Sequence, residues 1–137
     1  MRFMVIVKAS KESEAGMMPG EEIFTAMGRY NAELAKAGVF LSADGLHPSS
    51  KGARVRFSGE TRTVTDGPFA ETKELIAGFW LLQANSKEEM IEWVKRAPFD
   101  GGTEVEIRQV FEMEDFGPEL TPALKESEER LRTQVAG

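Results

Sequence analysis

A short polar segment, residues 66–74, separates two strand-like runs and constrains how the chain can fold. The run before it, 61–65, alternates β-branched residues, and the run after it, 76–84, is almost entirely apolar. Both compositions are typical of strands. A strand cannot continue through Asp66-Gly67-Pro68, because the proline has no N–H to donate and the glycine before it tolerates positive φ. We therefore expect a tight turn here between two strands.

The same segment is the first candidate for a functional site. The Asp66 carboxylate can accept N–H groups from the turn that it opens, which explains one of its polar residues. Glu71, Thr72, Lys73 and Glu74 follow at once, and a turn does not need them. A solvated face is the favoured interpretation of the three charged ones, with Lys73 also a candidate for orienting an anionic ligand.

Length and composition predict one globular domain without covalent or metal cross-links. The chain has 137 residues, of which 41% are hydrophobic and 29% charged. It contains no cysteine, which excludes disulfides, thiolate nucleophiles and Cys-based metal sites, and its single histidine argues against a metal centre. We expect no cofactor. The apolar run 3–7 is too short to cross a membrane and no signal peptide precedes it, so we expect a cytoplasmic protein.

The charge of the chain is acidic and unevenly distributed. The net charge is −6, which argues against direct binding of nucleic acid, because such binding needs clustered positive charge. Residues 112–137 hold seven acids and three bases, while residues 1–111 hold sixteen acids and fourteen bases. We therefore expect a near-neutral body, 1–111, followed by an acidic C-terminal tail, 112–137, that contains one helix and is accessory to the body.

Hydrophobic periodicity and capping signals place the secondary structure along the chain. Ser86 to Glu89 forms a capping box for a helix that Pro98 ends, and Gly38 is a stop signal for an earlier helix. Strands are expected at 3–7, 39–46, 53–57, 61–65, 78–84 and 103–110, and helices at 21–38, 86–97 and from 121 onward. Residues 8–20 are predicted to form a loop.

Residues 53–65 are predicted to form a β-hairpin closed by Ser58-Gly59-Glu60. A three-residue connection would place Arg56 opposite Arg62, with Arg54 on the same basic face. Like charges that face each other across two strands are unfavourable unless solvent, acids or a bound anion relieve them. A solvated face is favoured over an anion site.

Without this hairpin, the elements follow the order β-α-β twice. Two such units form one antiparallel sheet with both helices on one face, which is an α+β, ferredoxin-like βαββαβ sandwich with an inserted β-hairpin. The other face of the sheet would be bare. Because its strands are strongly apolar, we expect a homodimer that covers this face.

The run from Val64 to Glu74, VTDGPFAETKE, resembles the signature of the DGPF branch of the YCII-related family. Gly78-Phe79, the helix that ends at Ala97-Pro98 and the strand Glu106-Ile107-Arg108 fit as well, so the resemblance covers about residues 1–111. It implies the dimeric α/β-barrel superfamily, in which two such sheets pack together. It also implies a link to extracytoplasmic-function sigma factors, beside which family members are encoded.

The family resemblance also implies a His–Asp pair in a cleft between the helices and the sheet, with the histidine on the first helix. Residues 21–38 contain no histidine, so only Asp66 matches, and His47 is the one substitute. If the strands that end near these residues are neighbours in the sheet, Asp66 and His47 should be close enough to transfer a proton. Arg54, Lys73 and Trp80 are the candidate ligand-binding residues, although core packing is the simpler role for Trp80.

Two functional classes stay open. The first is a small-molecule enzyme that uses Asp66 as general acid or base, with His47, in a pocket between helices and sheet. The second is a non-catalytic dimer that binds a ligand or a protein partner, linked to sigma factors by the family resemblance. The sequence does not identify a substrate.

Overall fold

The computed structural model of the chain describes residues 1–136, with every side chain among them except that of Lys73. The elements, in chain order, are β1 (Arg2–Lys8), α1 (Lys11–Glu14), α2 (Glu21–Lys36), β2 (Phe40–Gly45), η1 (Ser49–Lys51), β3 (Ala53–Ser58), β4 (Thr61–Asp66), η2 (Thr72–Glu74), β5 (Ile76–Gln83), α3 (Lys87–Lys95), β6 (Val105–Gln109), η3 (Met113–Asp115) and α4 (Pro122–Ala136).

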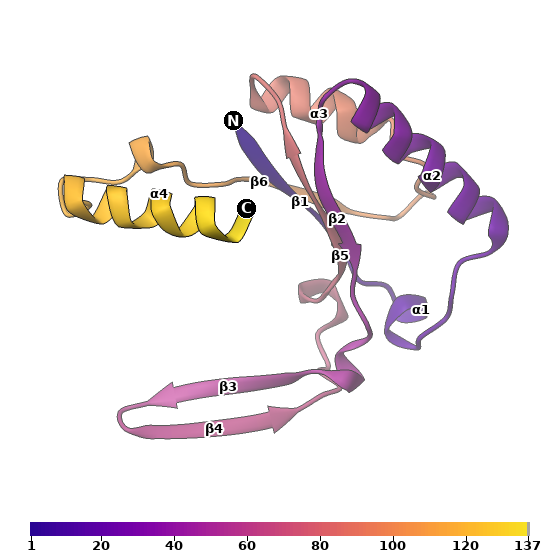
Figure 1. Ribbon diagram of the computed structural model, residues 1–137. Coiled ribbons are helices and arrows are strands. Elements are labelled where there is room, and N and C mark those ends of the chain that lie inside the picture. Colours follow the sequence, from indigo (N-terminus) through magenta and orange to yellow (C-terminus); the bar gives the residue numbers. More distant parts are fainter. Residues whose placement is uncertain (137) are drawn as a thin grey trace.

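The main sheet is four-stranded and antiparallel, in the order β2-β5-β1-β6. Helices α2 and α3 both lie on one side of it (Figure 1). This is the predicted ferredoxin-like βαββαβ arrangement, and the inserted hairpin β3–β4 forms a separate two-stranded sheet. The predicted fold class is confirmed.

The hydrophobic core lies between the sheet and these two helices. Alternate residues of β1, Phe3 and Val5, point into it, because side chains alternate between the faces of a strand. Leu34 of α2, Met90 of α3 and Leu82 of β5 are fully buried there. Side chains therefore fill the space in which the sequence predicted a ligand pocket.

The helix ends follow local capping chemistry. Ser86 Oγ accepts the Glu89 N–H at 3.1 Å at the start of α3, as predicted. The predicted capping box is not completed, because Glu89 Oε2 accepts the N–H of Asn85, at 3.2 Å, and not that of Ser86. The segment 8–20 differs from the prediction, because it contains the short helix α1. Ser10 and Ser13 form a reciprocal capping box, in which Ser10 Oγ accepts the Ser13 N–H at 3.1 Å and Ser13 Oγ accepts the Ser10 N–H at 2.8 Å.

The hairpin has a different register from the predicted one. Its loop is the two-residue Gly59-Glu60, with Gly59 at φ +59°, so Arg62 lies opposite Phe57 and Arg56 lies opposite Thr63. A glycine with positive φ at the first loop position suits a two-residue hairpin turn. The predicted opposition of two arginines is therefore wrong, and nothing in this register requires an anion to relieve it.

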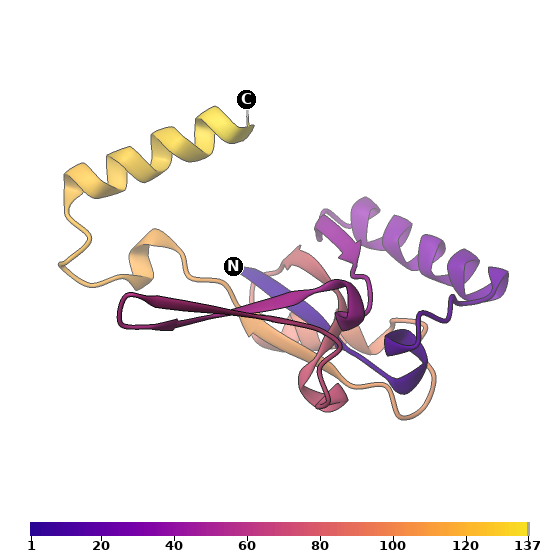
Figure 2. The same cartoon turned by 90° about the horizontal axis from the view of Figure 1, so that it is seen from below.

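The face of the main sheet away from α2 and α3, here called the outer face, has an apolar centre. Met4 and Ile6 of β1 pair with Leu81 and Phe79 of β5, so these four side chains share that face. The hairpin β3–β4 and the helix α4 both project from this side of the sheet (Figures 1 and 2). Neither helix of the core layer covers it.

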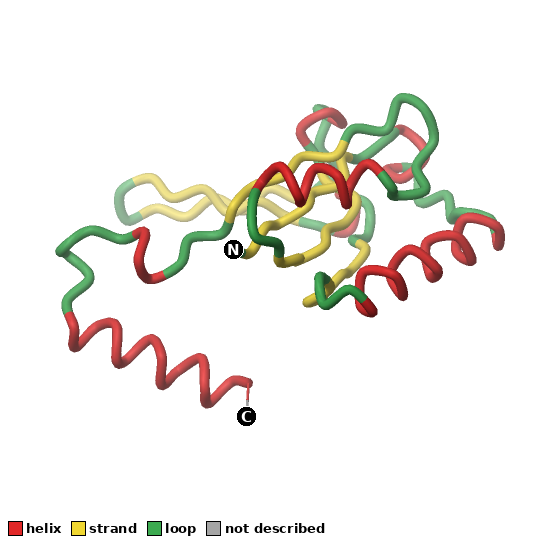
Figure 3. The backbone as a smooth tube through the Cα atoms, turned by 90° about the horizontal axis from the view of Figure 1, so that it is seen from above, coloured by secondary structure: helices red, strands yellow, loops and turns green. Residues whose placement is uncertain are grey.

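Tail residues 112–136 form η3 and α4, which extend away from the body (Figure 3). No residue of α4 is buried. None of the helices within residues 1–136 is both long and apolar enough to cross a membrane.

We predict that a second copy covers the outer face, since an apolar stripe of this kind is costly to expose. Light scattering at micromolar concentration should give about twice the chain mass of 15.2 kDa. Leu81→Glu should shift the protein toward the monomer, because it places a charge in the centre of the stripe. Ala32→Glu, on the exposed side of α2, introduces the same charge and should leave the dimer intact. A wild-type monomer would contradict this arrangement.

Candidate functional site

The segment 66–74, here called the signature segment, connects β4 to β5 and packs against η1 and α1 through one serine. Ser49 donates its backbone N–H to Glu14 Oε2 at 2.9 Å and its hydroxyl to Glu14 Oε1. The same hydroxyl oxygen accepts the Phe69 N–H at 3.0 Å. Three segments that are distant in the sequence are thus joined at Ser49.

Gly67 is required by close approach of the backbone. Its N–H donates to Gly52 O at 2.9 Å, and a Cβ built on it would lie 1.8 Å from Ser49 O. Positive φ, the reason proposed from the sequence, does not apply, because the positive-φ residues among 1–136 are four other glycines. The Gly67–Pro68 peptide bond is cis.

Arg54 lies against the signature segment, where it stacks on an aromatic ring. Its guanidinium carbon is 3.8 Å from the centroid of the Phe69 ring, which is a cation–π contact. The structure shows a structural role for Arg54, in which the side chain joins β3 to the segment that follows β4, and its ligand-binding role stays a prediction.

The Glu14 carboxylate is the charged group of this junction. Hydrogen bonds from the Ser49 hydroxyl and then from the Ser49 N–H lower the pKa of Glu14, and burial opposes them. The Ser49 hydroxyl accepts from an amide and donates to a carboxylate whose lowered pKa makes it a weak base. This cluster therefore holds segments together instead of activating a nucleophile.

A surface cleft of about 590 Å³ lies beside the signature segment. We call it the signature cleft. One wall consists of residues 9–11, between the end of β1 and the start of α1. The other wall is the second half of the signature segment. The backbone joins the two walls, since Ala9 N–H donates to Leu75 O at 2.9 Å. The lining residues are Ala9, Ser10, Lys11, Ala70, Glu71, Thr72 and Glu74.

The structure does not bring Asp66 and His47 together as a pair. Both are exposed, and no hydrogen bond joins them anywhere in the described part of the chain. The prediction required that β2 and β4 be neighbours in one sheet. They are not, because β4 pairs only with β3 in a separate ribbon and the neighbour of β2 is β5. The carboxylate of Asp66 faces solvent and does not line the signature cleft.

Trp80 belongs to the core. The residue is 6% exposed, its ring makes edge-to-face contacts with Tyr30 and Phe99, and its Nε1–H donates to Asn31 Oδ1 at 2.8 Å. Core packing, the simpler of its two predicted roles, is therefore what the structure shows. The Lys73 side chain lies outside the described residues.

Sequence reasoning missed Ser49 and Glu14. The contacts of Ser49 with Glu14 and Phe69 span 35 and 20 residues, so no local pattern marks them. The spacing Ser10-x-x-Ser13 could have indicated α1, the element that carries Glu14. In residues 1–136, no group of three or more His, Asp or Glu side chains gathers as a metal site.

We predict that Glu14→Gln destabilises the protein more at neutral than at acid pH. The folded-state pKa of Glu14 is lowered, so its contribution is present above the pKa of the unfolded chain and is lost as pH falls through the folded value. Urea unfolding at pH 7 and in acid should show wild type and variant converging in acid. Glu12→Gln, an exposed acid on the same helix, is the control. A pH-independent difference would contradict the charged role.

Comparison with known proteins identifies a family and two similar proteins. The YCII-related domain family matches residues 1–114. An uncharacterized protein, R00369 of Rhizobium meliloti (strain 1021), is 31% identical over 75 residues, which cover 55% of this chain and 60% of that protein. A solved structure, 5-chloro-2-hydroxyhydroquinone dehydrochlorinase (TftG) from Burkholderia phenoliruptrix AC1100 in complex with 2,5-dihydroxybenzoquinone, is similar over 83% of this chain and 98% of that one, at 17% identity and a TM-score of 0.42. The extent of the family match shows that the chain belongs to the YCII-related domain family.

Proposed function

We propose that this protein binds a small molecule in the signature cleft. The observation that carries the proposal is the cleft itself, whose volume of about 590 Å³ lies within the range of small-molecule sites. The hydroxyl groups of Ser10 and Thr72, the ammonium of Lys11 and the carboxylates of Glu71 and Glu74 supply both donors and acceptors. Most of the lining surface is apolar, so the cleft suits a ligand with an apolar body and a few hydrogen-bonding groups.

The junction at Ser49 supports the proposal, because a binding site needs walls that are held in place. The Phe69 N–H is bound to Ser49 one residue before the cleft wall begins at Ala70. On the other side, Glu14 ties the end of α1 to the same serine. Both walls of the cleft are thereby anchored to one point of the body.

Acid–base chemistry by Asp66 with His47 is an extension of this proposal. Both residues are exposed in the single chain, so the chemistry requires that a ligand or a second copy cover them. The alternative, a non-catalytic dimer that binds a protein partner, is supported by the exposed apolar side chains of the hairpin. Its proposed link to sigma factors rests on the family resemblance alone.

We predict that a metabolite screen by thermal shift will find ligands whose effect depends on the cleft. A ligand at 100 times its Kd stabilises the folded state by about 2.7 kcal/mol, which raises the melting temperature by several degrees. Ala70→Trp should abolish this shift, since the indole would fill the cleft. Ala32→Trp, on exposed α2, should retain it. An equal response in both variants would place the ligand elsewhere.

Asp66→Asn tests the acid–base extension separately, because it keeps the shape of the side chain and removes its charge. If the extension is correct, the bound ligand extends beyond the cleft to Asp66, and the variant should lose the ligand response and keep its unliganded melting temperature. A normal ligand response would exclude a role for the carboxylate in binding and leave the cleft proposal intact. A large fall in the unliganded melting temperature would show that Asp66 is structural.

A further inference from the structure

The hairpin β3–β4 exposes two chemically different faces. Val55 and Val64 pair directly, and Phe57 pairs with Arg62, so these four side chains share one face. Phe57 is 70% exposed and Val64 is 64% exposed. Arg54 and Arg56 lie on the opposite face among threonines. A two-stranded ribbon is marginally stable alone, and an apolar face of this kind needs a covering surface.

The tail of the same chain offers an apolar groove of about 610 Å³ between the segment 111–120 and helix α4. We call it the tail groove. Its apolar lining includes Phe111, Phe116, Leu124 and Leu131, which are all about half exposed or more. The charged lining consists of Glu112, Glu128, Glu129 and Arg132, and is therefore net negative.

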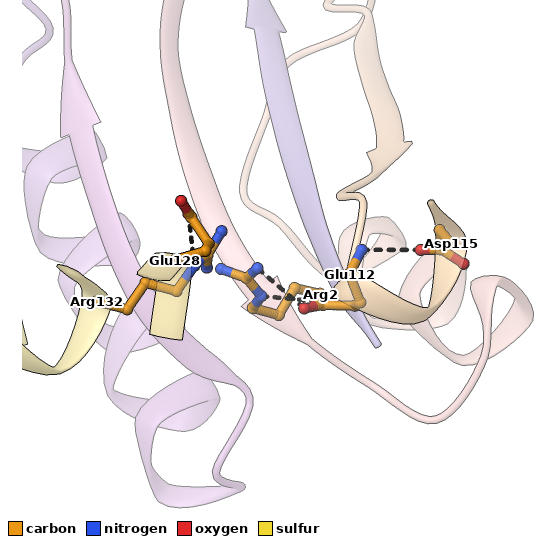
Figure 4. Close-up of polar contacts among 5 residues, drawn as sticks. All are labelled: Arg2, Glu112, Asp115, Glu128 and Arg132. Carbon is orange, nitrogen blue, oxygen red and sulfur yellow. Dashed lines mark hydrogen bonds and ion pairs between the residues drawn. The ribbon is translucent and has the colours of Figure 1, made fainter. Parts of the chain in front are cut away.

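The root of the tail is tied to the outer face of the sheet. Arg2 Nε and Nη2 donate to the two carboxylate oxygens of Glu112 at 2.8 and 3.1 Å, and Asp115 Oδ2 accepts the Glu112 N–H at 2.8 Å (Figure 4). Val110 N–H also donates to Arg2 O at 2.9 Å. Glu128 and Arg132 of α4, which are paired with each other, lie beside this cluster in the same view. The groove therefore stands on the side of the sheet from which the hairpin also projects.

We infer that the hairpin of one copy docks its apolar face into the tail groove of a second copy. Charge complementarity supports this occupant. Arg54 and Arg56 lie on the opposite face, and the apolar face itself carries Arg62 near the hairpin tip and Asp66 at its base, whereas the tail, 112–137, has a net charge of −4. Arg62, whose guanidinium carbon lies 4.4 Å above the Phe57 ring, sits on the apolar face, where it would meet the acidic side chains of the groove.

A second copy fits the geometry better than the same chain. The hairpin and α4 of one chain are well separated (Figure 1). In a dimer with a two-fold axis, the two outer faces would pack together and the contact would occur twice. Each hairpin would lie in the tail groove of the other copy, which gives a closed dimer. This inference goes beyond the proposed ligand site and assigns a role to the tail, most of which lies outside the family match.

The absence of cysteine from the chain makes disulfide trapping a direct test. Val64→Cys and Leu124→Cys would be prepared as separate full-length variants, mixed, allowed to exchange and oxidised. The expected product is a covalent heterodimer of the two variants. Thr63→Cys, one residue away on the opposite face of the hairpin, replaces Val64→Cys in the control and should give little cross-linked product.

Other disulfide products would overturn the inference. Cross-linking of Val64→Cys to itself would show that the hairpins meet each other at the axis. In the double variant, an intrachain disulfide at monomer mass would show that the hairpin occupies its own groove. Equal yields from Thr63→Cys and Val64→Cys would show that the contact is not specific for the apolar face.

Phe57→Asp gives a second, independent readout on a surface residue that the fold does not need. It should weaken dimerisation at least tenfold by sedimentation equilibrium, because it places a carboxylate against the acidic groove. Ser58→Asp is the control. Ser58 follows Phe57 in the strand and lies on the other face of the hairpin, so this variant should leave dimerisation unchanged. If both variants fold normally and Phe57→Asp dimerises as tightly as the wild type, the inference is contradicted.

Discussion

Gly67 approaches the backbone of Ser49 closely, and this contact constrains the path of the signature segment. A Cβ on Gly67 would lie 1.8 Å from Ser49 O, so only glycine lets the signature segment pass this point. The approach fixes the direction in which the hairpin leaves the body. It also places the Phe69 N–H on the Ser49 hydroxyl and so positions the wall of the signature cleft. The signature segment is thus a structural junction first, and its second half supplies the candidate site.

A second constraint is the uncovered outer face. Helices α2 and α3 cover one side of a four-stranded sheet whose other side carries Met4, Ile6, Phe79 and Leu81. The hairpin and the tail project from that same side, each with exposed apolar residues of its own. Three unpartnered surfaces on one side of a small protein are consistent with one dimer interface that covers them all. In this account the inserted hairpin and the tail serve the assembly, and the body carries the ligand site.

The strands of the main sheet, the core helices and the Ser86 cap could be predicted from the sequence, because periodicity and capping are local. The hairpin register could not, since Gly59-Glu60 and Ser58-Gly59-Glu60 are both plausible loops and one residue decides which side chains face each other. The proximity of Asp66 to His47 assumed a strand order that the hairpin insertion prevents. Ser49 and Glu14 could not be found, because their contacts depend on tertiary structure. The sequence analysis singled out Gly67 for its tolerance of positive φ. In the structure glycine is needed there because a Cβ would clash with the Ser49 backbone.

The stability of Gly67→Ala tests the central claim most directly, with Gly52→Ala as the matched control. Both glycines flank Ser49, but a Cβ on Gly52 would lie 3.4 Å from Ser49 O, an ordinary contact. The account predicts that Gly67→Ala lowers the free energy of unfolding by more than about 2 kcal/mol, because backbone must move to relieve the clash. Gly52→Ala should change it by well under half as much. Equal, small effects in both variants would contradict the view that this close approach organises the structure.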